Sequence, residues 1–180
     1  MSDTKDVLDR AADAALEIAG EGGWRDATLR DIAARADVSF AELYGRASGK
    51  PALLARISGR LDKAALGAAE GDGEDVHDRL FDAAMARVEA MEPHRQALIA
   101  MSEGRGRVIF ALTAPRTARA ILEAAGVDAT PPRLAAMTAV WLRIVQVWRD
   151  DEGALNRTMA EIDRRLKSMR ERLGHIRAGF

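Results

Sequence analysis

TLRDIAARADVSFAELYGRASGK, residues 28–50, is the stretch of sequence that decides the fold. Leu29, Ile32 and Ala33 recur at helical spacing, and Thr28 with an acidic residue three positions later predicts a capped helix start. A turn over residues 37–38 then leads to a second helix, capped by Ser39. Two short helices joined by a tight turn predict a helix-turn-helix motif.

The rest of the 180-residue chain also reads as helical, so the predicted fold class is all-α. Hydrophobic residues make up 48% of the chain and aromatic residues only 4%, which favours packed amphipathic helices over sheets. Apolar periodicity, interrupted by glycine and proline, predicts the remaining helices. They cover about 4–20, 51–69, 74–91, 93–104, 107–113, 116–126, 132–150 and 154–175.

A change in composition suggests the domain boundary. The Gly-rich, acidic stretch at 71–75 separates a small N-terminal module from the remainder. We therefore expect a helix-turn-helix domain over 1–50, a connecting helix over 51–70, and a second helical domain over 71–180.

Charge and cysteine content narrow the function classes. The formal net charge is −1, but residues 25–63 hold 8 basic and 5 acidic side chains, net +3, so any attraction to nucleic acid is local. Absence of cysteine excludes disulfides and Cys nucleophiles and fits a cytoplasmic location. The N-terminus lacks a basic n-region, and no apolar run reaches the roughly 20 residues of a spanning helix.

The N-terminal motifs resemble one family. Over about residues 4–65 the chain contains, in order, the motifs AALEIAGEGGW, ATLRDIAARADVS, LY, a lysine and ALL. This segment is similar to the N-terminal domain of the TetR family of bacterial transcriptional regulators. The resemblance implies a cytoplasmic homodimer that binds a palindromic site in double-stranded DNA. The DNA-binding residues that it implies are Thr28, Arg30, Ser39, Phe40, Ala41, Glu42, Tyr44, Arg46 and Lys50. Taken singly, Thr28, Ser39 and Tyr44 also suit purely structural roles.

The second helix of the motif departs from the family pattern. Phe40, Ala41 and Glu42 stand where a lysine, a small residue and a threonine are common, and Gly45 and Ala47 are also unusual there. Glu42 could accept a hydrogen bond from a cytosine amino group, and Phe40 could touch a thymine methyl. These departures leave two functions open: a repressor released by a small, apolar effector, or a protein of this fold that binds lipid or another apolar molecule and no longer reads DNA.

The second domain offers candidates for a ligand pocket and a subunit interface. Two coiled-coil-like seams predict a dimer through a four-helix bundle, although the first seam could equally face the chain's own core. The interface residues are Leu134, Trp141, Trp148, Leu155, Met159, Ile162, Leu166, Met169 and Leu173. The expected pocket lining is Phe81, Met85, Val88, Met101, Phe110, Met137, Trp141 and Ile144. No buried charge can be singled out, and no catalytic, metal or cofactor motif is present, so we expect no enzyme.

Overall fold

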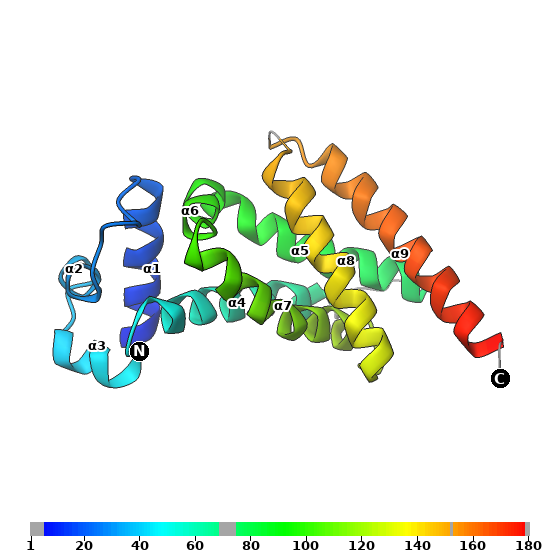
Figure 1. Ribbon diagram of the computed structural model, residues 1–180, viewed down its shortest axis with the longest axis horizontal. Coiled ribbons are helices and arrows are strands. Elements are labelled where there is room, and N and C mark those ends of the chain that lie inside the picture. Colours follow the sequence, from blue (N-terminus) through cyan, green and yellow to red (C-terminus); the bar gives the residue numbers. More distant parts are fainter. Residues whose placement is uncertain (1–5, 69–74, 152, 179–180) are drawn as a thin grey trace. The chain divides into compact units, whose positions relative to one another are not determined.

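The computed structural model describes residues 6–68, 75–151 and 153–178, and over these residues all regular secondary structure is helical (Figure 1). This confirms the all-α fold class. Most of the acidic stretch at 71–75 lies outside the described residues. The helices are α1 (Val7–Gly20), α2 (Leu29–Arg35), α3 (Phe40–Arg46), α4 (Lys50–Gly67), α5 (Val76–Met91), a 3-10 turn η2 (Glu92–His94), α6 (Arg95–Met101), α7 (Arg105–Ala124), α8 (Pro131–Arg149) and α9 (Asn156–Ala178).

The chain divides into two compact units. Unit 1 comprises Met1–Arg60 and Pro93–Leu112, and unit 2 comprises Leu61–Glu92 and Thr113–Phe180. Helices α4 and α7 each begin in unit 1 and end in unit 2. Among the described residues, no helix is both long and apolar enough to cross a membrane.

Small and branched apolar residues build the core of unit 1. Helix α1 packs on α6 and on the helix-turn-helix, and it buries alanines on the contacting faces. Ile32 from α2, Leu43 from α3 and Leu53 from α4 are each 0% exposed. This shared core fixes α2 and α3 against α1.

Helices α5, α8 and α9 pack together in unit 2, where α8 and α9 run side by side (Figure 1). Both predicted seams supply this core. Trp141 and Trp148 of α8 and Ile162 and Leu166 of α9 are at most 3% exposed in the single chain. The expectation that these four side chains form a subunit interface is thus revised, because the chain's own helices already cover them.

The remaining seam residues differ in exposure. Met169 is buried, Leu134 and Leu155 are half-buried, and Met159 is 42% exposed. The side chain of Leu173 lies outside the described part of the chain. Of this group, Met159 is the most available to a second subunit.

Helix α7 corrects the prediction of two short helices. It runs without a break through Pro115, which was expected to separate helices over 107–113 and 116–126. Proline removes the hydrogen bond to the carbonyl four residues earlier, here that of Ala111. Both residues are exposed, so water can satisfy that carbonyl and the helix tolerates the proline.

Candidate nucleic-acid interface

The turn between α2 and α3 is held from α1. Asp37 has a φ of 50°, in the left-handed region that few residues other than glycine adopt. One guanidinium nitrogen of Arg10, Nη2, donates to the carbonyl of Ala36 at 2.7 Å and to that of Asp37 at 2.5 Å. It also lies 3.2 Å from the Asp37 carboxylate, which is fully exposed. Arg10, which the sequence did not single out, therefore fixes the turn.

The two helix starts of the motif differ. Thr28 Oγ1 accepts a hydrogen bond from the Asp31 amide, and Asp31 Oδ2 accepts from the Thr28 amide at 2.7 Å, so the predicted capping box is confirmed. The bond from the Thr28 amide, and after it one that the Thr28 hydroxyl donates to the same carboxylate oxygen at 2.7 Å, lower the pKa of the Asp31 carboxyl. Ser39 occupies the N-cap position of α3, but its side chain makes no capping hydrogen bond. The expected Ser39 cap is thus correct in position only.

Aromatic side chains dominate the exposed face of α3. Phe40 is 37% exposed and Tyr44 56%, and their ring centres lie 5.9 Å apart. The guanidinium of Arg30, from α2, lies 5.0 Å from the centre of the Phe40 ring, a cation–π contact. Ala41 and Glu42 are also exposed. We call these five residues, Arg30, Phe40, Ala41, Glu42 and Tyr44, the reading face.

Two cationic side chains among the implied DNA-binding residues have protein partners. Arg46 lies 2.5 Å from the carboxylate of Asp6 and 3.4 Å from that of Glu42. Lys50 Nζ donates to the Trp24 carbonyl at 2.6 Å and sits 4.6 Å from the centre of the Trp24 ring. Burial there lowers the pKa of the Lys50 ammonium. Lys50 thus ties α4 to the segment between α1 and α2, a contact to a backbone carbonyl that no sequence pattern reveals.

Comparison with known proteins identifies the segment that carries these contacts. The family described as bacterial regulatory proteins, tetR family, matches residues 12–57. The chain carries a TetR-family N-terminal domain. The match spans α1 from residue 12, all of α2 and α3 and the first part of α4, so it includes both helices of the helix-turn-helix.

Solved TetR-family regulators share the fold over 89–93% of this chain. A TetR transcriptional regulator from Nitrosomonas europaea ATCC 19718 is 24% identical, with a TM-score of 0.71, covering 92% of this chain and 98% of that one. One from Rhodococcus sp. RHA1 is 18% identical, with a TM-score of 0.69 and coverages of 89% and 93%. A point variant of TetR from Acinetobacter baumannii AYE, in complex with minocycline, is 22% identical, with a TM-score of 0.57 and coverages of 93% and 96%. No curated protein sequence matches the chain.

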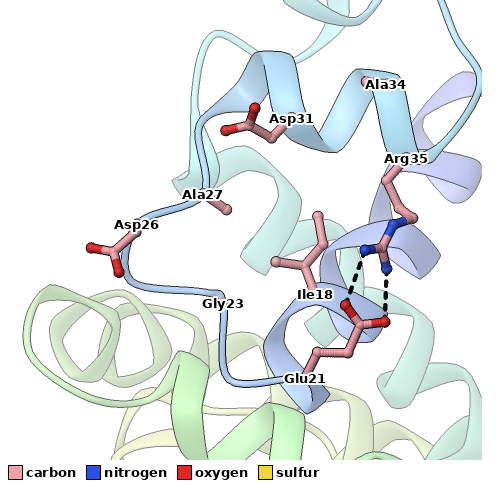
Figure 2. A pocket seen from close by; sticks show the side chains of 8 residues that line it. All are labelled: Ile18, Glu21, Gly23, Asp26, Ala27, Asp31, Ala34 and Arg35. Atoms are coloured by element: carbon pink, nitrogen blue, oxygen red, sulfur yellow. Dashed lines mark hydrogen bonds and ion pairs between the residues drawn. The ribbon is translucent and has the colours of Figure 1, made fainter.

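A shallow groove of about 550 Å³ lies between the end of α1 and α2 of the TetR-family domain (Figure 2). Glu21 and Arg35 point toward each other across it and form two hydrogen bonds of 2.9 Å. The bond from Arg35 lowers the pKa of the Glu21 carboxyl. Asp26 and Asp31 add further carboxylates to the lining. Since its one lining cation is already paired, this groove does not suit a phosphate.

The expected pocket residues fall in both units of this TetR-fold chain. Phe81, Met85, Val88, Met137, Trp141 and Ile144 belong to unit 2, whereas Met101 and Phe110 belong to unit 1. All but Phe81 and Phe110 are buried. Among the described residues, no group of three His, Cys, Asp or Glu side chains could hold a metal ion.

Sequence reasoning missed a buried charge pair in unit 2. Asp62 and Arg87 are each 4% exposed and hydrogen-bonded to one another, contrary to the expectation that no buried charge can be singled out. A sequence pattern that indicates the burial of Arg87 was present. Arg87 lies three and four residues from the apolar positions Ala84 and Met91, in the buried stripe of α5.

Proposed function

We propose that this protein is a TetR-family transcriptional regulator that reads double-stranded DNA with the reading face of α3. The observation that carries the proposal is the exposure of Phe40 and Tyr44 on a short helix whose position is fixed by α1. In helix-turn-helix proteins the second helix of the motif enters the major groove, where its side chains touch base edges.

The chemistry of the reading face indicates which bases it suits. An exposed aromatic ring can bury itself against a thymine methyl, and a carboxylate can accept from a cytosine amino group. Phe40 and Glu42 both lie in the first turn of α3, two positions apart. We therefore propose an operator half-site that contains both thymine and cytosine in the groove facing this turn.

Thymine-to-uracil substitution tests this proposal, because it deletes only the 5-methyl group. Duplexes selected by the purified protein from a random pool are compared, by fluorescence anisotropy, with copies carrying deoxyuridine at each thymine in turn. At one half-site position, deoxyuridine in place of thymine lowers the affinity of the wild type for the duplex by about fivefold to tenfold. Phe40→Ala loses that discrimination, while the control Leu112→Ala, altered at a side chain 75% exposed on α7, keeps it.

We further propose that the protein acts as a homodimer on a palindromic site, as a repressor. Two recognition helices of a dimer lie about 34–36 Å apart, one turn of DNA. Support comes from α8, whose residues Ala135, Ala139 and Leu142 are exposed at 4, 3 spacing, on the side of the helix away from its buried stripe. This second stripe, rather than the buried tryptophans, is our candidate contact for a second subunit.

A small effector bound in unit 2 completes the proposal. The similar structure from Acinetobacter baumannii is a complex with a small molecule, minocycline, which supports a ligand site in a chain of this fold. An effector that favours one arrangement of the protein shifts the equilibrium between DNA-binding and released states by its differential affinity for them.

A second function is favoured by one observation, the pairing of Lys50 and Arg46 with protein groups. Fewer phosphate contacts weaken DNA binding, so a protein of this fold that binds a lipid or another apolar molecule without reading DNA is the alternative. The two are separated by measuring duplex binding at about 50 mM salt and, on the same sample, bound lipid by native mass spectrometry. If the protein binds none of the selected duplexes, the proposal that it is a DNA-binding regulator is contradicted.

A further inference from the structure

Three buried polar side chains from three helices meet in unit 2. Asp62 of α4, Arg87 of α5 and Thr117 of α7 are 4%, 4% and 1% exposed. Arg87 Nε donates to Asp62 Oδ1 at 2.8 Å, and Thr117 Oγ1 donates to the same oxygen at 2.8 Å. One carboxylate oxygen therefore receives both donors.

The other carboxylate oxygen, Asp62 Oδ2, accepts no hydrogen bond from the described residues, although it is inaccessible to solvent. Arg116 Nε is 3.9 Å away, beyond hydrogen-bond distance, and its side chain is 72% exposed. A buried polar atom without a partner is costly, and nearly all such atoms in folded proteins are paired. This oxygen is thus a buried acceptor that no described residue uses.

The surroundings of the carboxylate combine apolar and aromatic groups. The Arg87 guanidinium lies 4.5 Å from the centre of the Trp141 ring, and Arg87 Nη1 lies 3.1 Å from the Met91 sulfur. Val88, next to Arg87 in α5, is 0% exposed. Such an environment suits an apolar body, while the carboxylate suits a cationic head.

An anionic ligand fits this cluster poorly. It would have to compete with Asp62 for Arg87, whose Nε is already bound to that carboxylate, and it would face Asp62 Oδ2 at short range. An uncharged apolar ligand would leave the oxygen without a donor.

We propose that the effector of this protein is an amphipathic amine, whose protonated nitrogen donates a hydrogen bond to Asp62 Oδ2. The inference rests on the proposed ligand-responsive regulator and gives the chemical class of its ligand. Asp62 lies on α4, the helix that also carries Arg56 and Arg60, which pair with Asp9 and Asp13 of α1 at 2.7 Å each. A bond to Asp62 therefore acts on the helix that is anchored to the TetR-family domain.

The test compares ligands that share one skeleton and differ in the head group. Isothermal titration calorimetry on the full-length protein measures the affinities of phenylalkylamines with two to six methylenes, and of the carboxylates and alcohols of the same lengths. At the best chain length the amine binds at least about tenfold more tightly than the matching carboxylate. Absence of binding by every amine, or equal affinity for amine and carboxylate, overturns the proposal.

Asp62→Asn is the decisive variant. Its amide oxygen can still accept from Arg87 and Thr117, whereas its nitrogen replaces the Oδ2 acceptor by a donor. The amine preference is lost, by about tenfold. Because the variant removes the carboxylate charge that Arg87 bonds, the double variant Asp62→Asn/Arg87→Gln is measured alongside, and thermal unfolding confirms that both fold.

Thr117→Val is the matched control. It removes a donor to Oδ1 and leaves Oδ2 unchanged, so it lowers the unfolding temperature but keeps the amine preference. If Thr117→Val abolishes the preference as fully as Asp62→Asn, the cluster has only a structural role. Duplex binding is measured separately. If the protein binds DNA but no amine, only this inference is contradicted. If it binds amines but not DNA, only the proposed DNA-binding regulator is contradicted.

Discussion

At the scale of single residues, the helix-turn-helix depends on one arginine from outside the motif. Arg10 comes from α1, 26 and 27 residues before the carbonyls of Ala36 and Asp37 that it bonds. The sequence predicted a turn over residues 37–38, between the two short helices of the motif. It could not predict the donor, because a side chain that bonds backbone carbonyls leaves no complementary residue to find.

Loss of the Arg10 side chain should destabilise the turn more than loss of the Asp37 charge. Arg10→Ala removes a charged donor from two carbonyls, and we expect it to lower the free energy of unfolding by about 1–2 kcal/mol. Asp37→Asn removes only an exposed ion pair and tolerates the left-handed backbone, so its effect stays within about 0.5 kcal/mol. Urea unfolding followed by circular dichroism measures both, and equal losses would contradict the carbonyl contacts.

Gly45 makes helix α3 less stable than alanine at the same position would. It lies inside α3, and a Cβ built there meets nothing within 4 Å. Gly45→Ala should raise the free energy of unfolding by about 0.5–1 kcal/mol, because alanine loses less backbone entropy in a helix. Gly22→Ala is the control. Its φ is +84°, so alanine there should cost about 1–2 kcal/mol despite equally open space. A loss of stability in Gly45→Ala would show that α3 needs the glycine.

At the scale of helices, local chemistry in the sequence predicted most boundaries. The Thr28 cap and the apolar spacing after it placed α2 correctly, because both are determined by residues within one turn. The predicted helix break at Pro115 was wrong, because the free-energy cost of a proline within a helix depends on whether the freed carbonyl reaches water. Lys50 was expected at DNA because of the family resemblance, whereas no sequence pattern indicates the Trp24 carbonyl to which it donates.

The α8–α9 pair is held at one edge by a carboxylate among arginines. Glu161, 5% exposed, is 3.2 Å from Arg143 of α8 and 2.7 Å from Arg165, and it also pairs with Arg164. Burial opposes its ionisation most strongly, but the hydrogen bonds from the two α9 arginines outweigh it and lower the pKa of Glu161 to about 2.

This pKa predicts a pH dependence of stability. A carboxyl whose pKa is lower in the folded state stabilises the fold above its unfolded value, near 4.5, and loses that contribution as the pH falls toward about 2. Glu161→Gln should therefore cost about 1–2 kcal/mol at pH 6, after discounting for the exposed arginines, and much less near pH 3. Glu123→Gln, which alters an exposed pair, is the control for chemical unfolding at each pH. A difference that does not change with pH would contradict the assignment.

At the scale of the whole molecule, a heptad pattern does not say which surface covers it. The seams of α8 and α9 were correctly recognised as apolar stripes, yet the same spacing serves a subunit interface and a chain's own core. The structure resolves this for Trp148 and Ile162, which are at most 2% exposed within one chain. Leu142, 44% exposed on α8, lies outside the predicted seam, in a separate exposed stripe that the sequence did not indicate.

This exposed stripe leads to a prediction about the dimer. A charge at Leu142 faces solvent in the single chain, so Leu142→Glu should leave the fold intact and produce a monomer by sedimentation velocity if α8 forms the interface. Leu166→Glu instead buries a charge at a side chain 1% exposed, so it should unfold the protein rather than dissociate it. Leu112→Glu, at an exposed side chain of α7, should remain dimeric with wild-type stability. If Leu112→Glu dissociates the dimer and Leu142→Glu does not, the interface lies on α7 and not on α8. The glutamate at position 142 would then face solvent in the dimer as well.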